Sequence, residues 1–148
     1  MSPFDDKLIL TVTELETEIR HFTGWLDIYP RSERREIIKA LHWSRTVHEG
    51  QVRESGEPYI IHPIRTAEIL IDFKMDPSVI KGALLHDVLE DTDVSKQDLV
   101  DNFGPEVASL VEGVTKIDDM DVGKSARKAA SLRKMVWAMV DDLRVIFI

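Results

Sequence analysis

Residues 80–93, IKGALLHDVLEDTD, decide the fold, because the apolar residues of this predicted helix lie around most of its circumference and not on one face only. At about 100° per residue, the apolar positions leave little of the helix circumference for water. They are Val79, Ile80, Leu84, Leu85, Val88 and Leu89. We therefore expect this helix to be the buried centre of a domain.

The same helix ends in crowded ionisable residues, with His86 one turn before Glu90 and Asp87 one turn before Asp91. Anions at a helix C-terminus are disfavoured by about 0.3 to 1 kcal/mol each, and desolvated carboxylates cost more unless they are paired. A divalent metal bound by His86 and Asp87 would compensate for this cost. Glu90 and Asp91 would then handle water or protons. From spacing alone, a solvated helix end paired with lysines and arginines is an equally good interpretation.

The rest of the chain also predicts helices, because no alternation of apolar and polar residues is long enough for a sheet. The expected class is all-α, a bundle of about seven to eight helices in one domain spanning residues 1–148. Ser32 is a candidate N-cap, and Ser95 with Asp98 resembles a capping box. The predicted helices are 5–22, 32–50, 63–73, 76–91, a short one after Ser95, 105–116, 125–140 and one from Asp142, with a mobile loop at 117–124.

Composition excludes several classes of function. The 148 residues hold 19 basic and 27 acidic side chains, a net charge of -8, which disfavours nucleic-acid binding. No apolar run approaches the ~20 residues that a membrane helix needs. The acidic N-terminus and the absence of cysteine predict a cytoplasmic protein. Residues 86–121 hold eleven acids against two lysines, and such a field attracts cations, including metals.

A second cluster lies in residues 50–63, GQVRESGEPYIIHP, a loop dense in hydrogen-bonding groups of the kind that often bind ligands. His62 precedes a predicted helix, so it is either an N-cap or a third metal ligand. Arg53 is either a surface charge or a planar guanidinium offered to a base or phosphate. His48 falls on the apolar face of the preceding helix, and we expect it to be a packed histidine.

Four runs of residues, in this order along the chain, carry a family resemblance. They are HEGQVRESGEPYIIHP (48–63), GALLHDVLEDT (82–92), FGPEVASLVEGVTK (103–116) and RKMVWAMVDDLRVI (133–146). Together they closely resemble the HD-type hydrolase domain of RelA/SpoT proteins, which degrade the alarmone ppGpp. The resemblance covers roughly residues 29–148. It implies an α-helical HD domain that holds one divalent metal, Mn2+, and removes the 3′-pyrophosphate of ppGpp or pppGpp to give GDP or GTP.

The resemblance also implies roles for individual residues. The implied metal ligands are His62, His86 and Asp87, and the implied pair that activates water is Glu90 and Asp91. The implied nucleotide contacts are Arg53, Ser55, Tyr59 and Lys116.

The chain departs from the family pattern at two places. Glu54 stands where many members have lysine, in a position that contacts the base. The family continues with a segment whose aspartate completes the metal site, whereas this sequence stops at Ile148. We therefore expect a domain shortened at its C-terminus, with a weakened metal site, and a C-terminal synthetase domain in a longer parent protein.

Two other functions stay open at this point. One is a related nucleotide phosphohydrolase with another substrate, such as NADPH, which is possible because Glu54 replaces the lysine of many family members. The other is a catalytically silent HD domain that binds a nucleotide without turning it over. Metal content together with a product assay on ppGpp separates these functions.

Overall fold

Every regular element of the described chain is a helix, which confirms the all-α class. The computed structural model describes residues 3–52 and 56–119, and the side chains of residues 14–52 and 56–115. The elements are α1 (Pro3–Trp25), the 3-10 helix η1 (Leu26–Ile28), α2 (Arg31–Val47), α3 (Ile61–Asp72), α4 (Pro77–Leu85), α5 (Val88–Asp91), α6 (Lys96–Phe103) and α7 (Pro105–Asp119). None of these helices is long and apolar enough to cross a membrane.

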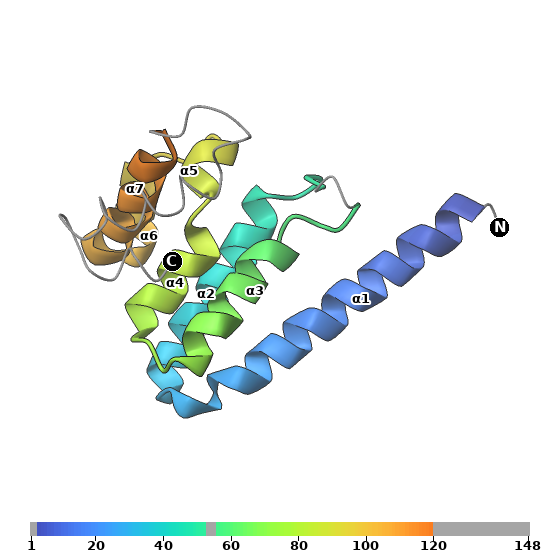
Figure 1. Cartoon of the computed structure of the whole chain (residues 1–148), viewed down its shortest axis with the longest axis horizontal. Coiled ribbons are helices and arrows are strands. Elements are labelled where there is room, and N and C mark those ends of the chain that lie inside the picture. Colours follow the sequence, from blue (N-terminus) through green and yellow to red (C-terminus); the bar gives the residue numbers. More distant parts are fainter. Residues whose placement is uncertain (1–2, 53–55, 120–148) are drawn as a thin grey trace.

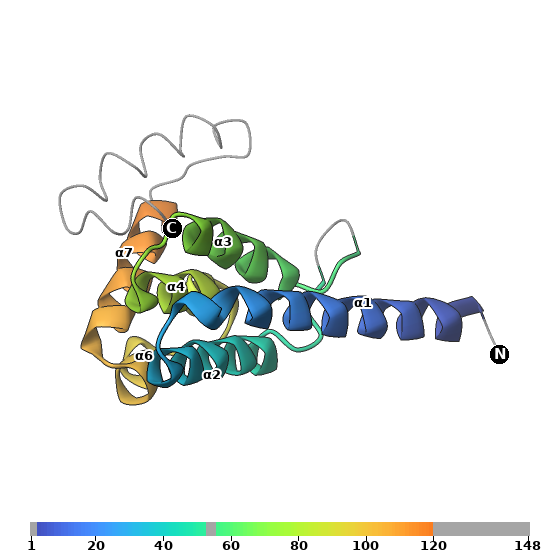
Figure 2. The same ribbon diagram turned by 90° about the horizontal axis from the view of Figure 1, so that it is seen from below.

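Helix α4 lies at the centre of the molecule, between α2 and α3 on one side and α7 on the other (Figure 1). Its apolar residues are buried, as the sequence predicts, because the neighbouring helices cover it from several directions. The fully buried ones are Val79, Ile80, Ala83, Leu84 and Leu85. Helix α1 packs along α3 and then extends beyond the other helices (Figure 2). The end of α4 therefore places whatever follows it deep in the protein.

Proline and glycine residues set several helix limits. Pro77 and Pro105 are the first residues of α4 and α7, where the missing N–H has no helical partner to lose. Gly50 follows α2 with a φ of 81°, and Gly104 separates α6 from α7 with a φ of 90°. Both angles lie in the left-handed region, which glycine adopts without a steric penalty.

Helix α1 spans Pro3–Trp25 and extends beyond the predicted 5–22 at both ends. The predicted starts of the second and third helices are also wrong by a residue or two. Helix α2 begins at Arg31 with Pro30 as its N-cap, so Ser32 lies inside the first turn and does not cap the helix. It ends at Val47, earlier than the predicted stop at Gly50. Helix α3 begins at Ile61, so the predicted first residue, Pro63, lies within its first turn. A first turn tolerates proline at several positions, since its N–H groups have no helical acceptors.

The predicted helix over residues 76–91 is interrupted where the ionisable residues begin. Helix α4 ends at Leu85, His86 and Asp87 form a turn, and α5 resumes at Val88. The side chain of His86 bonds to the backbone carbonyl of Ala83, in the last turn of α4. This contact gives a partner to one of the carbonyls that lie beyond the reach of the helical pattern.

The C-terminal predictions are tested only in part. Helix α7 continues to Asp119, so the predicted loop is wrong for residues 117–119. Extending an existing helix by one turn is favourable, because propagation adds a hydrogen bond for each residue that is fixed. The remainder of that loop and the predicted helices at 125–140 and from Asp142 lie outside the described residues.

The predicted capping box at the start of α6 is confirmed. The Ser95 hydroxyl accepts a hydrogen bond from the backbone N–H of Asp98 at 3.1 Å. In return, the Asp98 carboxylate accepts from the backbone N–H of Ser95 at 2.9 Å. The backbone and side-chain hydrogen bonds from Ser95 hold the pKa of Asp98 below its ordinary value. The charged form of Asp98 therefore stabilises the fold.

We expect Asp98→Asn to lower the melting temperature at pH 7, because asparagine can accept the Ser95 hydrogen bond but lacks the charge. A carboxyl with a lowered folded-state pKa contributes stability above its unfolded pKa of about 3.9 and loses it as the pH falls through the folded value. The difference from wild type should therefore shrink below about pH 4. Thermal melts across pH measure this effect. Asp101→Asn, on the same helix, is the control, and an equal pH-dependent effect there would contradict the assignment.

Candidate metal centre

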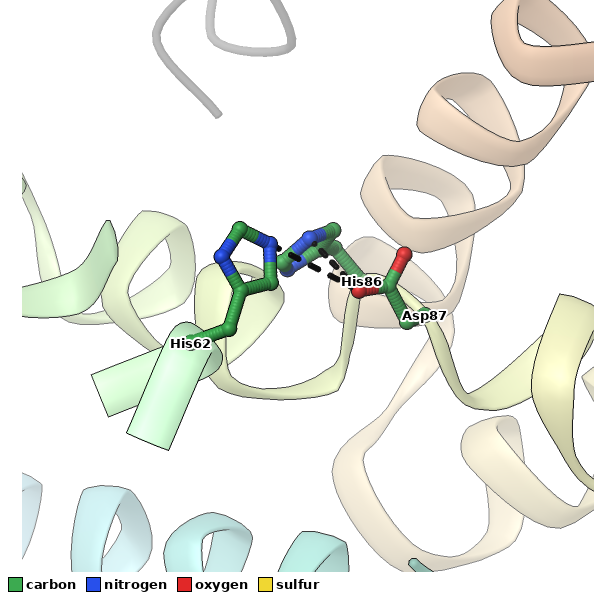
Figure 3. Close-up of side chains that lie close together, drawn as sticks. All are labelled: His62, His86 and Asp87. Carbon is green, nitrogen blue, oxygen red and sulfur yellow. Dashed lines mark ion pairs between the residues drawn. The ribbon is translucent and has the colours of Figure 1, made fainter. Parts of the chain in front are cut away.

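Three side chains from two helical regions meet at the buried end of α4 (Figure 3). His86 and Asp87 follow α4 directly, and His62 lies in the first turn of α3. The Asp87 Oδ2 lies 3.0 Å from the His86 Nε2 and 3.8 Å from the His62 Nε2. One ligand atom from each residue falls within 4.8 Å of the other two. The side chains of His86 and Asp87 are 9% and 12% exposed and that of His62 is 37% exposed, so the cluster opens to solvent beside His62.

The proton arrangement at His86 favours a cation in this cluster. The His86 Nδ1 lies 2.6 Å from the carbonyl oxygen of Ala83, which can only accept, so Nδ1 carries the proton. In the neutral ring, the Nε2 lone pair then faces the Asp87 carboxylate. Two acceptors at this distance require a proton or a metal ion between them. A backbone carbonyl that fixes the tautomer is also the usual companion of a metal-binding histidine, so the residues fit a divalent metal.

Tyr59 connects this cluster to α5. Its hydroxyl lies 2.5 Å from the Asp87 Oδ2 and 2.8 Å from the Asp91 Oδ2, so the two carboxylates share its one hydrogen as acceptors. Burial is the main cause that raises the pKa of Tyr59, and the hydrogen bonds and charges of both carboxylates raise it further. Tyr59 therefore stays a hydrogen-bond donor at neutral pH.

Asp87 carries a full negative charge at neutral pH although it is largely buried. Burial alone would raise its pKa, but an imidazolium at His86, in which a proton on Nε2 takes the place of the cation inferred above, acts in the opposite direction through its hydrogen bond and its charge. With the hydrogen bond from Tyr59 and the charge of His62, they lower the pKa to about 2. The carboxylate is therefore available as a metal ligand over the whole physiological pH range.

The structure brings some of the predicted site residues together and leaves others untested. His62, His86 and Asp87 form the cluster, and Asp91 is joined to it through Tyr59. Glu90 lies on α5 and is exposed. Arg53 and Ser55 lie outside the described residues, as does the side chain of Lys116 on α7, so their nucleotide contacts stay predictions.

Sequence reasoning missed two contacts of the loop before α3. It did not foresee that the Tyr59 hydroxyl bonds to two carboxylates, and the contact of Tyr59 with a nucleotide stays a prediction. It assigned no role to Gln51, whose side chain reaches the backbone of Asp91. Residue spacing carries no signal for either contact, because the partners are 28 and 40 residues apart along the chain. The expectation that His48 is a packed histidine is confirmed, since it is 3% exposed.

Comparison with known proteins places the chain among HD domains. Residues 40–148 match the family model described as HD domain. The chain is 52% identical over 116 residues to a guanosine-3′,5′-bis(diphosphate) 3′-pyrophosphohydrolase of Vibrio cholerae. It is 47% identical over 120 residues to the bifunctional (p)ppGpp synthase/hydrolase SpoT of Escherichia coli. These alignments cover 75% and 80% of this chain, which spans only 16% and 17% of the length of the two relatives.

A solved structure gives a similar result. It is that of a metazoan ortholog of SpoT that hydrolyzes ppGpp and plays a role in starvation responses. It superposes with a TM-score of 0.54 at 28% sequence identity, over 76% of this chain and 71% of the other. The fold of the described chain is thus the fold of that hydrolase.

We expect the purified protein to retain a divalent metal after dialysis and His86→Ala to lose most of it, because the substitution removes the most buried nitrogen ligand. Loss of one metal ligand should weaken the affinity for the metal by at least about 10- to 100-fold. That is the range of about 10- to 100-fold observed when only a residue that orients a ligand is lost. Metal analysis and Mn2+ titration measure this change. His42→Ala, an exposed histidine of α2, is the control. Equal metal retention in the two variants would refute the site.

Proposed function

Because the chain belongs to the HD domain family, in its RelA/SpoT branch, we propose that it is a divalent-metal-dependent hydrolase of guanosine tetra- and pentaphosphate. In the proposed reaction, water displaces the 3′-pyrophosphate of ppGpp or pppGpp and leaves GDP or GTP. The proposed metal is Mn2+, because a site with two imidazoles and one carboxylate suits it. One HD-type domain over residues 1–148 and a cytoplasmic location are part of the same proposal.

The observation that carries this proposal is the meeting of two histidines and a charged aspartate beside a second carboxylate, that of Asp91. A stable structural cluster would pair these groups with lysine or arginine. Within the described residues, the Asp87 carboxylate contacts two imidazoles and a phenol, and a metal ion can neutralise its charge. The relatives that share the surrounding sequence are named for hydrolysis at the 3′-pyrophosphate.

Each residue has a separate task in the proposed mechanism. The implied ligands are His62, His86 and Asp87, and the metal, when bound, supplies a Lewis acid that polarises a phosphoryl oxygen and lowers the pKa of water. Tyr59 holds the carboxylates of Asp87 and Asp91 at a fixed separation through its hydroxyl. Glu90 or Asp91 orients the attacking water and accepts its proton.

The nucleotide is proposed to bind through the loop before α3 and through α7. The proposed contacts are Arg53, Ser55, Tyr59 and Lys116. The substrate is strongly anionic and the protein has a net charge of -8, so local cations must supply the attraction. The related proteins include a synthase/hydrolase and a GTP pyrophosphokinase of Myxococcus xanthus, and we propose a synthetase domain as the partner of this domain.

We expect Glu90→Gln and Asp91→Asn each to keep the fold and the metal and to reduce ppGpp hydrolysis by about 100-fold or more, the usual contribution of a general base. Glu36→Gln, an exposed acid of α2, should leave turnover unchanged. Release of pyrophosphate from ppGpp, measured with Mn2+ in excess, decides the roles. If one acid variant keeps full turnover, the base is the other residue. If both do, the proposed mechanism is wrong.

We expect Arg53→Ala to weaken ppGpp binding by about fivefold, the effect of losing one cation–π or charge contact of about 1 kcal/mol, with metal binding unchanged. Calorimetry on the metal-loaded protein measures it, with Arg31→Ala as the control. Parallel turnover assays with ppGpp and NADPH test the substrate class. Faster turnover of NADPH would favour the related phosphohydrolase, and binding of ppGpp without turnover of either would favour a silent domain.

A further inference from the structure

One side chain of the loop before α3, that of Gln51, joins this loop to the last residue of α5. The Gln51 Nε2 donates a hydrogen bond to the backbone carbonyl of Asp91 at 2.9 Å. The Gln51 Oε1 lies 3.0 Å from the Nδ1 of His48. The backbone of Gln51 is also fixed, because its N–H donates to the carbonyl of His48 and its carbonyl accepts from the N–H of Tyr59.

The donors and acceptors in this chain of contacts can be arranged in one way only. The Asp91 carbonyl can only accept, so the amide nitrogen of Gln51 must face it. The amide oxygen then faces His48 and can only accept, so the His48 Nδ1 must carry a proton. His48 is 3% exposed, and its Nε2 is buried with no hydrogen-bond partner among the described residues.

Asp91 is therefore held from this loop at two places. Tyr59 bonds to its carboxylate, and Gln51 bonds to its backbone carbonyl. The ring of His48 lies against the ring of Tyr59 with centroids 4.5 Å apart, so both contacts share one support. Helix α5 has only four residues and cannot hold its own direction through helical hydrogen bonds. Its last carbonyls need partners from elsewhere, and Gln51 supplies one.

We propose that Gln51, oriented by His48, is a positioning residue that fixes the end of α5 and thereby aims the Asp91 carboxylate at the metal centre. This inference rests on the proposed function, in which Asp91 is one of the two acids that activate water. Gln51 acts through Asp91 and is not assigned a contact with the substrate. Its loss should therefore reduce kcat and leave KM and metal affinity nearly unchanged.

The test uses the full chain with two pairs of variants. Gln51→Met keeps the length of the side chain and removes both hydrogen bonds. Gln97→Met, the control, removes the side-chain hydrogen bond of an exposed glutamine of α6 to Asp101. We expect Gln51→Met to lower kcat for ppGpp by about 10-fold, as for other supports of a metal site. KM and Mn2+ affinity should stay within about twofold of wild type, because Gln51 contacts neither the substrate nor a metal ligand. A residue that orients a metal ligand directly would change the metal affinity by about 10- to 100-fold. Gln97→Met should change none of these values.

The second pair guards against a loss of folding in the first. His48→Asn places an amide N–H where the Nδ1–H stands, whereas His48→Leu removes it. We expect His48→Asn to keep more of the wild-type kcat than His48→Leu at similar thermal stability. A purely structural role for His48 predicts the reverse, because leucine packs better than asparagine in a buried position. Equal kcat in the two variants would overturn the proposal.

Nuclear magnetic resonance separates this proposal from the proposed function. In wild type and Gln97→Met, the Nδ1 of His48 should carry a proton. The carboxyl resonance of Asp91 should shift in Gln51→Met and not in Gln97→Met. If wild type does not hydrolyse ppGpp, the proposed function fails, and the Asp91 resonance alone decides the positioning role. An Asp91 resonance that is the same in Gln51→Met and wild type overturns the positioning role, whatever the turnover.

Discussion

Two hydrogen-bond acceptors, the His86 Nε2 and the Asp87 carboxylate, lie 3.0 Å apart at the end of a buried helix. This arrangement is stable only with a proton or a cation between them. The other features of the site hold the two acceptors in this position. The Ala83 carbonyl fixes the His86 tautomer, so the ring cannot turn its N–H toward the carboxylate without losing that bond. Helix α4 cannot move away, because α2, α3 and α7 pack around it.

The parts of the fold that could be predicted are those in which neighbouring residues decide the outcome. The apolar circumference of residues 79–85 predicts a central helix, and α4 is central. The capping box of Ser95 and Asp98 could be recognised because both bonds lie within four residues. The helix starts near Ser32 and Pro63 were misplaced by a residue or two, because a first turn accepts several residue types at each position.

The parts that could not be predicted depend on contacts between distant segments. The spacing of His86, Asp87 and Asp91 indicates crowded charges, but it does not tell that Tyr59 bridges two of them. Nor does it tell that the helix is interrupted at His86, since its apolar pattern continues through Val88. The bond from His86 to Ala83 and the packing of Val88 in the core accompany this interruption. The periodic spacing of apolar residues shows which face of a helix is buried. It does not show how two consecutive buried helices are oriented relative to each other.

The direction of α4 has a consequence for the order of binding events. Its C-terminal end, with the partial negative charge of its last carbonyls, points at the same place as the carboxylates of Asp87 and Asp91. Such a site attracts a divalent cation and repels a polyphosphate. A nucleotide that approaches before the cation therefore meets a barrier, and one that approaches after it meets an attraction. In the proposed hydrolysis, the divalent cation would therefore bind before the nucleotide, and the supply of the cation would set how much of the protein can bind the nucleotide.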